Sequence, residues 1–280
     1  MQDLSLIQTI LLAVVEGLTE FVPVSSTGHI LILQSLLGVE STDFVKAFTI
    51  MVQLGAILSV VFVYRKRFFH IDHELSYCET TSIWKLIAKY DFYYKLLLGF
   101  LPTAVVGYLF KDTIDKLLEN VDIVAGMLVL GGLFMLFTDK FFKNDRNASF
   151  LTNRKAFNVG LFQCLALIPG VSRSMAAIIG GMVQKLTRKE AVEFSFFLAV
   201  PSLITASGYK MVQLFLEYGL QVFITHKWEL IIGNLAAFVV SSMVIRLFIN
   251  FIMKHGFTAF GWYRIMVGGC ILLMNLIKLS

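Results

Sequence analysis

The amino-acid sequence predicts an all-α integral membrane protein with six transmembrane helices and two re-entrant helical hairpins, arranged as an inverted-topology repeat. Hydrophobic residues make up 57% of its 280 side chains and charged residues 15%, whereas soluble domains contain roughly 45–50% and 25%. Six apolar stretches are long enough to cross a bilayer, which takes about 20 residues. Two further apolar stretches are interrupted near the middle by proline and serine.

The six predicted spans follow one another without a polar segment long enough for a soluble domain, so we expect a single membrane domain. Their residues are 46–64, 91–110, 120–138, 191–216, 229–253 and 258–279. The interrupted stretches cover residues 4–38 and 156–184. Each would open one half of the repeat, and the halves are predicted at about residues 1–138 and 156–280.

Each interrupted stretch is predicted to form a re-entrant hairpin. The first contains Pro23 followed by a run of hydroxyl side chains, and the second contains Pro169 and Gly170 followed by serine. Proline and glycine end a helix and a serine caps the next one, so each half is too short to span. Irregular backbone at membrane depth is tolerated when it is buried in protein or lines a wet cavity, and we expect both turns in such a place.

Lysine and arginine predict the orientation of the chain. The segments 65–90, 139–155, 185–190 and 254–257 hold fourteen of them. The opposite side holds five: Lys46, Lys111, Lys116, Lys227 and Lys278. Because cytoplasmic loops are enriched in these residues, both termini are predicted on the outer face, with the first hairpin entering from outside and the second from inside. The net charge of +5 is explained by these loops, so no nucleic-acid partner is expected.

Two acids lie in the first interrupted stretch. Glu16 and Glu20 are four residues apart, which places their carboxylates on one helix face with Cβ atoms about 5–6 Å apart. A charged residue near a helix centre in the bilayer costs at least about 2.5–3.5 kcal/mol. We therefore expect a cation, a proton or a wet cavity beside them. The alternative is a water-filled vestibule near the surface in which the acids only aid folding.

The segment from Ser25 to His29 follows Pro23 and reads Ser-Ser-Thr-Gly-His. At a helix start, hydroxyls and free backbone N–H groups form an anion pocket that the helix dipole favours. His29 adds an imidazole suited to proton transfer or nucleophilic attack. Taken alone, such a run is an ordinary N-cap, but its position next to intramembrane acids favours a site.

The second interrupted stretch supplies Ser172, Arg173 and Ser174. Arginine keeps its charge, and its fork matches two phosphate oxygens, so an anionic ligand is expected. The alternative is a structural salt bridge from Arg173 to Glu16 or Glu20. A diphosphate brings about three negative charges, which Arg173 cannot neutralise together with the two glutamates. A divalent cation, Mg²⁺ or Ca²⁺, held by these carboxylates completes the site.

Residues 16–29 (EGLTEFVPVSSTGH) and 169–174 (PGVSRS) closely resemble the two signatures of the bacterial undecaprenyl-diphosphate phosphatases, also called bacitracin resistance proteins. The resemblance extends to residues 48–57 and 194–201 and covers essentially the whole chain. The family's second motif usually continues Gly-Ala-Thr, where this chain has Met175-Ala-Ala, which puts a threonine contact there in doubt.

The resemblance implies an enzyme of the bacterial inner membrane that hydrolyses undecaprenyl diphosphate to undecaprenyl phosphate and inorganic phosphate. This reaction recycles the lipid carrier for cell-wall synthesis. The resemblance also implies dependence on a divalent cation and a site that opens to the outer face. The expected partners are therefore the polyprenyl diphosphate substrate and membrane lipid, and a homodimer is left open.

Our hypothesis gives three roles to the site residues. The catalytic residues are Glu16, Glu20, Ser26, His29 and Arg173. The phosphate-binding residues are Ser25, Thr27, Ser172, Ser174 and Arg173. The metal ligands are Glu16 and Glu20. The attacking group is Ser26 with His29 as base, His29 itself, or a metal-activated water.

Two other function classes, a transporter and a structural scaffold, compete with hydrolysis. A transporter or flippase of a polyprenyl phosphate is the alternative, because inverted repeats with broken helices are the plan of many secondary transporters. A structural scaffold is disfavoured, since it gives no reason to bury acids, a histidine and an arginine. Among the remaining polar residues, Gln53 faces the cavity or bonds another helix, and Lys210 and Arg264 are expected to snorkel from near their helix ends.

Overall fold

The computed structural model describes residues 4–69, 90–118, 120–142 and 150–279. Every regular element in these ranges is a helix, as predicted. Six helical segments are long and apolar enough to cross a membrane, which confirms the number and position of the predicted spans. They are Asp43–Val63 (α3, Asp43–Met51, with α4, Gln53–Val63), α7 (Asp91–Leu109), α9 (Val121–Phe141), α12 (Arg188–Tyr218), α14 (Lys227–His255) and α15 (Thr258–Leu279).

The first span is broken at Val52, which the sequence did not predict. The Asn234 side chain of α14 accepts a hydrogen bond from the Gly55 backbone N–H at 2.7 Å. A side chain that inserts into the hydrogen-bond ladder is a known cause of a helix break. Three short helices complete the connections: α5 (Arg65–Phe69), α8 (Lys111–Leu118) and α13 (Gln221–Thr225).

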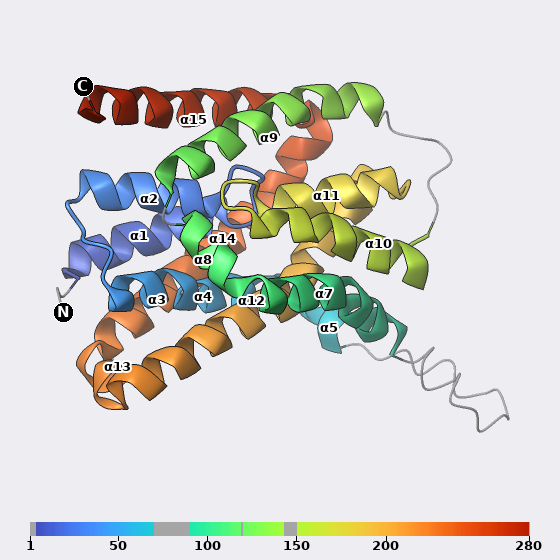
Figure 1. Cartoon of the computed structure of the whole chain (residues 1–280). Coiled ribbons are helices and arrows are strands. Elements are labelled where there is room, and N and C mark those ends of the chain that lie inside the picture. Colours follow the sequence, from blue (N-terminus) through green and yellow to red (C-terminus); the bar gives the residue numbers. More distant parts are fainter. Residues whose placement is uncertain (1–3, 70–89, 119, 143–149, 280) are drawn as a thin grey trace, which may run out of the picture.

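Each interrupted stretch forms two short helices joined by a break. The first pair is α1 (Leu6–Thr19) and α2 (Ser26–Leu36). The second is α10 (Asn153–Gln163), continued by the 3₁₀ turn η2 (Cys164–Leu167), and α11 (Arg173–Val183). Figure 1 shows that each pair starts and ends at one end of the molecule, α1–α2 at the end opposite to α10–α11. Their turns, break 1 (residues 20–25) and break 2 (residues 168–172), meet in the middle; re-entry into a bilayer stays a prediction.

The two halves exchange their broken helices. α1 packs on α14 of the second half, and α10 packs on α7 of the first half. Both contacts use glycine, because a Cβ on Gly17 would lie 3.0 Å from the Ala237 oxygen and one on Gly160 would lie 2.1 Å from the Gly99 oxygen. Small residues allow such close approach in membranes. An internal repeat would produce such an exchanged pattern, and the repeat and its inversion both stay predictions.

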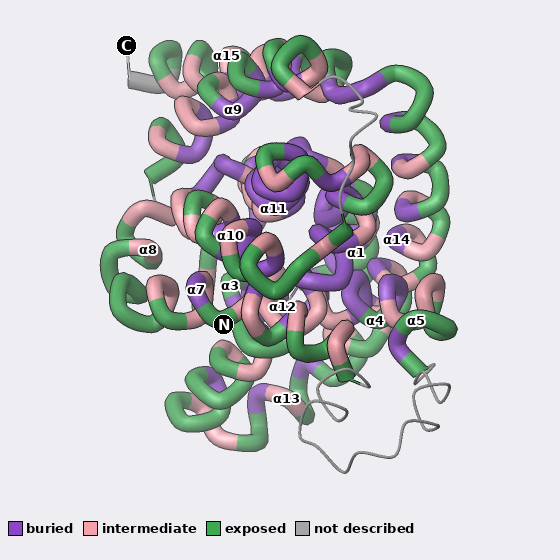
Figure 2. The backbone as a smooth tube through the Cα atoms, turned by 90° about the vertical axis from the view of Figure 1, so that its right-hand side faces the viewer, coloured by how far each residue is buried: buried purple, intermediate pink, exposed green. Residues whose placement is uncertain are grey.

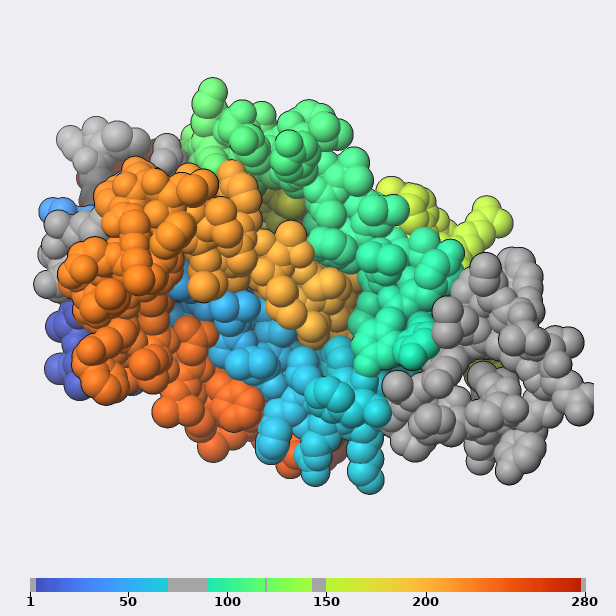
Figure 3. Space-filling model, turned by 90° about the horizontal axis from the view of Figure 1, so that it is seen from below, coloured from blue at the N-terminus to red at the C-terminus, as the bar shows by residue number. Residues whose placement is uncertain are grey.

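Large apolar side chains are exposed on the outer helices, and the interior holds an apolar core together with a smaller set of buried polar groups. Exposed large hydrophobic side chains cover α7, α12 and α4, among them Tyr108, Leu216 and Leu58; Figure 3 shows these helices together on one face. By contrast, every residue of α11 from Ser174 to Met182 is buried, as Figure 2 shows. A lipid-facing exterior around polar, protein-covered broken helices is therefore the overall plan.

Candidate active site where the two helix breaks meet

The acids lie at the end of α1. Glu16 is 2% exposed and Glu20, which follows the last residue of the helix, is 7% exposed. Their carboxyl groups interact with each other, and Glu16 also interacts with the Gln53 side chain of α4. Gln53 therefore faces this site, and its contact with Glu16 also joins α4 to α1, so both predicted roles of Gln53 fit the structure. The two acids are buried side by side, so the predicted surface vestibule does not describe them.

Both breaks end at a serine with an unusual backbone. Ser25 has φ of 69° and Ser172 has φ of 76°, and each precedes the first residue of a helix, Ser26 in α2 and Arg173 in α11. A positive φ is sterically unfavourable for residues with a side chain, and such strain of about 1–3 kcal/mol concentrates at functional sites. The first residue of each following helix, Ser26 and Arg173, contacts the same acid, Glu20 of break 1.

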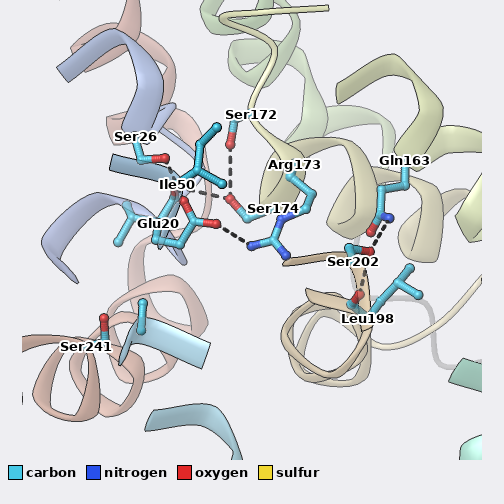
Figure 4. A network of polar contacts seen from close by, with 12 residues as sticks. Glu20, Ser26, Ile50, Gln163, Ser172, Arg173, Ser174, Leu198, Ser202 and Ser241 are labelled. Carbon is cyan, nitrogen blue, oxygen red and sulfur yellow. Dashed lines mark hydrogen bonds and ion pairs between the residues drawn. The ribbon is translucent and has the colours of Figure 1, made fainter. Parts of the chain in front are cut away.

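Glu20 joins the two breaks. One carboxylate oxygen accepts a hydrogen bond from Arg173 Nη2 at 2.7 Å, and the other accepts one from Ser26 Oγ at 2.6 Å. Figure 4 shows both contacts with Glu20 between the two side chains. The predicted convergence of Glu20, Ser26 and Arg173 is thus present in the structure, and part of it is the ion pair that was the alternative for Arg173.

A second link crosses the breaks through hydroxyls. Ser174 Oγ donates to the Val22 backbone oxygen at 3.1 Å, so Ser172 Oγ, 3.0 Å away, donates to Ser174 Oγ. Ser172 Oγ also accepts from the Met175 N–H and caps α11. These serines hold break 2 against break 1, which gives them a positioning role in this conformation.

His29 lies in the first turn of α2 and contacts α15. Its Nδ1 is 2.8 Å from the Ser25 backbone oxygen, and its Nε2 is 2.7 Å from the Tyr263 hydroxyl. Because a carbonyl accepts only, Nδ1 carries the proton and Nε2 accepts from Tyr263. The two rings are also parallel, with centroids 5.5 Å apart. Sequence reasoning did not find Tyr263, which is 234 residues away in the chain.

Several polar atoms of the site are buried without a partner. They are Glu16 Oε1 and two nitrogens of the Arg173 guanidinium, Nε and Nη1. Buried polar groups in proteins are nearly always hydrogen-bonded, and unpaired ones indicate a missing ligand, ion or water. Arg173 therefore has donors left for an anion even while it pairs with Glu20, and a purely structural salt bridge does not account for them.

The donor set also fits a hard cation. Glu16 and Glu20 offer adjacent carboxylate oxygens, which Mg²⁺ and Ca²⁺ prefer. Within the described residues no cluster of three or more His, Cys, Asp or Glu side chains could hold a metal. The remaining ligands would come from phosphate oxygens and water, which is how Mg²⁺ commonly binds at phosphate sites. Among the other predicted phosphate-binding residues, Ser25 is buried in break 1 and Thr27 is half-buried in the first turn of α2.

One prediction about a charged side chain was wrong. Arg264 was expected to snorkel to the interface, but it is 0% exposed. Its guanidinium lies among backbone carbonyls of both breaks and of α9. A charge inside an apolar helix was the signal that could have identified it.

Comparison with known proteins matches the chain to a family. A sequence model of the family described as bacitracin resistance protein BacA matches residues 9–270. The chain belongs to the BacA family. The undecaprenyl-diphosphatase of Porphyromonas gingivalis is 49% identical to it over 278 residues, which cover 99% of both chains. That of Flavobacterium psychrophilum is 48% identical over 271 residues, which cover 96% of this chain and 95% of the relative. That of Bdellovibrio bacteriovorus is 40% identical over 276 residues, 97% of this chain and 96% of its own.

BacA membership confirms the resemblance that the two sequence signatures indicated. The match spans both broken-helix pairs and all six candidate spans, apart from the first three residues of α1 and the end of α15. Both signatures, residues 16–29 and 169–174, lie within it. The two breaks whose side chains meet in Figure 4 are therefore parts of one family-wide domain.

Proposed function

We propose that this BacA-family chain hydrolyses undecaprenyl diphosphate to undecaprenyl phosphate and inorganic phosphate. One observation carries the proposal: the buried Arg173 guanidinium keeps two N–H donors unpaired beside a serine that is hydrogen-bonded to a carboxylate. Arginine donors suit phosphate oxygens, and a serine bonded to a base suits nucleophilic attack. The relatives carry the name of the same activity.

In the proposed reaction Ser26 attacks the terminal phosphorus. Its hydroxyl already donates to Glu20, so Glu20 takes the proton as the Ser26 Oγ–P bond forms and the P–O anhydride bond breaks. Undecaprenyl phosphate leaves. Water then attacks the phosphoserine phosphorus, the Oγ–P bond breaks, and protonated Glu20 returns its proton to Ser26 Oγ as inorganic phosphate is released. Arg173 Nε and Nη1 hold the phosphoryl oxygens in line with the attack.

His29 does not contact the Ser26 hydroxyl, for which it was predicted as one possible base. Its hydrogen bonds run to Ser25 and Tyr263, whereas the partner of the Ser26 hydroxyl is Glu20. We assign His29 the proton of the attacking water in the second step: its Nε2 would exchange the Tyr263 hydroxyl for this water and take the proton. A direct role as nucleophile is an outcome that the trapping experiment below would detect.

A divalent cation belongs to the proposal as well. Glu16 and Glu20 would hold it together with diphosphate oxygens, and it would neutralise phosphate charge and polarise the phosphoryl group. Glu16 Oε1, buried and unpartnered, supports this placement. Purified protein should release phosphate from undecaprenyl diphosphate with Mg²⁺ or Ca²⁺, measured with malachite green, and a chelator should abolish the release. Release that persists unchanged with chelator would exclude the cation, and no release under any condition would refute the proposed function.

Trapping identifies the nucleophile. Rapid acid quench of substrate labelled in the terminal phosphate should leave label on the protein in an acid-stable phosphoserine, lost in Ser26→Ala. In a parallel alkaline quench, label that survives there but is absent after the acid quench would indicate His29 instead. The lack of any labelled protein at early times would leave water as the attacking group.

The Tyr263→Phe variant is expected to lower kcat/KM by about threefold to tenfold, since one hydrogen bond contributes about 0.5–1.5 kcal/mol. The matched control is Tyr218→Phe, which removes another interhelical tyrosine bond, to Asp43 at 2.7 Å, away from both breaks. The control should keep wild-type kcat/KM. Equal losses in both variants would remove Tyr263 from the site.

The membrane setting follows from the same proposal. The lipid tail would stay in the bilayer beside the apolar outer helices, and the diphosphate would enter between the breaks. We place the chain in the bacterial inner membrane with both termini outward; α1 begins and α15 ends at the same end of the molecule. The transporter alternative is not favoured, because the family and the named relatives indicate a phosphatase.

A further inference from the structure

Arg264 of α15 is the largest fully buried side chain in the described part of the protein. Its guanidinium donates to four backbone oxygens. Two belong to the breaks, Pro23 of break 1 (Nη1, 3.1 Å) and Gly170 of break 2 (Nη2, 2.8 Å). The other two belong to one turn of α9, Leu128 (Nε, 3.3 Å) and Met127 (Nη2, 3.2 Å). One side chain thus joins both breaks to α9.

The charge of this arginine has no acid beside it. Within the described ranges no carboxylate forms an ion pair with Arg264, and its hydrogen bonds all go to carbonyls. A buried cation without a counter-charge is costly, so a side chain of this kind requires a reason beyond packing. The compensation seen here comes from four carbonyl dipoles, two from α9 and one from each break, and the two break carbonyls contribute only while the breaks stay in place.

Two glycines, one in α9 and one in break 2, leave room for the Arg264 guanidinium. A Cβ on Gly131 of α9 would lie 2.3 Å from Arg264 Nη2 and 2.9 Å from its Cζ. Gly170 has φ of 92° and would place a Cβ 2.3 Å from the Val124 oxygen, so its carbonyl reaches Arg264 only because the residue is glycine. Both glycines leave space at the point where the arginine bridges α9 and break 2.

We infer that Arg264 is a positioning residue for the proposed reaction: it fixes the separation of the two breaks, and through them the distance between the Glu20–Ser26 pair and Arg173. It touches neither the reacting groups nor the phosphates in this arrangement. The inference rests on the proposed function, because its effect is read in the rate of phosphate release. Misplacement by about 1 Å at a reacting centre can cost about 100-fold in rate.

The sharpest test displaces the guanidinium without removing it. Gly131→Ala adds one methyl group against Arg264 and leaves every charged residue in the chain. Two glycine variants serve as controls. Gly126→Ala lies in the same helix with nothing within 4 Å of its Cβ. Gly261→Ala disturbs the α9–α15 contact at the Gly132 oxygen (2.9 Å) and at Leu136, and neither residue is an acceptor of Arg264. Arg264→Lys and Arg264→Gln complete the set, since each retains a donor that can reach fewer carbonyls.

We expect Gly131→Ala and both Arg264 variants to lower kcat by about tenfold to 100-fold with KM within about threefold of wild type. Gly126→Ala should match wild type, and Gly261→Ala should lower the melting temperature with kcat within about threefold. If the Arg264 variants do not fold, Gly131→Ala decides alone. Wild-type kcat in folded Gly131→Ala, or an equal loss in Gly261→Ala, would overturn the inference. A wild-type protein that releases no phosphate would instead refute the proposed function.

Discussion

Replacement of Arg173 by alanine is expected to lower kcat/KM for undecaprenyl diphosphate by about 10³- to 10⁴-fold, equivalent to about 4–5.5 kcal/mol. The variant loses the buried, unpaired donors Nε and Nη1 that we assign to the phosphates. It also leaves the Glu20 carboxylate, 7% exposed, without its charge partner. Arg173→Lys keeps the charge but not the planar fork, so an intermediate loss of about 100-fold is expected.

The control for Arg173 is Arg188→Ala. Arg188 forms a comparable interhelical ion pair with Asp139 at 2.7 Å. It lies at the start of α12, whereas the site is formed by the breaks. Removing one partner of such a pair destabilises a protein, so both alanine variants should melt at lower temperature. Of the two variants, only Arg188→Ala should keep activity per folded molecule within about threefold of wild type. Wild-type kcat/KM in folded Arg173→Ala would remove that residue from the site.

The second large effect is expected for Glu20→Gln, which keeps the shape of the side chain and removes its charge. We expect kcat/KM to fall at least about 10³-fold, because the amide can neither take the Ser26 proton nor hold Arg173 as an ion pair. Phosphate release at saturating Mg²⁺ measures it. Glu193→Gln is the control, since this half-buried acid on α12 lies 3.9 Å from Lys189. Unchanged activity in Glu20→Gln would exclude Glu20 as the base.

Much of this fold could be predicted because its signals are local. A bilayer requires about 20 apolar residues per span, so the six spans stand out in the composition of each segment. Pro23 and Pro169 mark both breaks through the chemistry of proline itself. Pro102 and Pro201, by contrast, lie inside α7 and α12 without ending them, in agreement with the uninterrupted apolar runs around them.

The parts that could not be predicted depend on distant partners. The break at Val52 reflects Asn234, which bonds Gly55 from 179 residues away. The Ser25 and Ser172 backbones, both with positive φ, have no residue-level signal, because serine rarely adopts that conformation.

The site residues divide in the same way, into those with a local sequence signal and those that depend on distant partners. Glu20 and Arg173 could be paired from the sequence because buried opposite charges require one another. Arg264 was misassigned because its position near the end of a helix allows snorkelling, and only the fold reveals the carbonyls that surround it. Likewise, the sequence suggested His29 as the base for Ser26, and only the turn of break 1 shows that the Ser26 hydroxyl donates to Glu20.

The central claim is that an acid from one break and a guanidinium from the other act in a single pocket, and a double-mutant cycle in phosphate release tests it most directly. Residues that act as a unit lose activity non-additively. The kcat/KM of the double variant Glu20→Gln/Arg173→Ala should therefore lie within about threefold of that of the less active single variant. Losses that multiply, in protein shown to be folded, would mean that the two side chains act independently and would contradict the account.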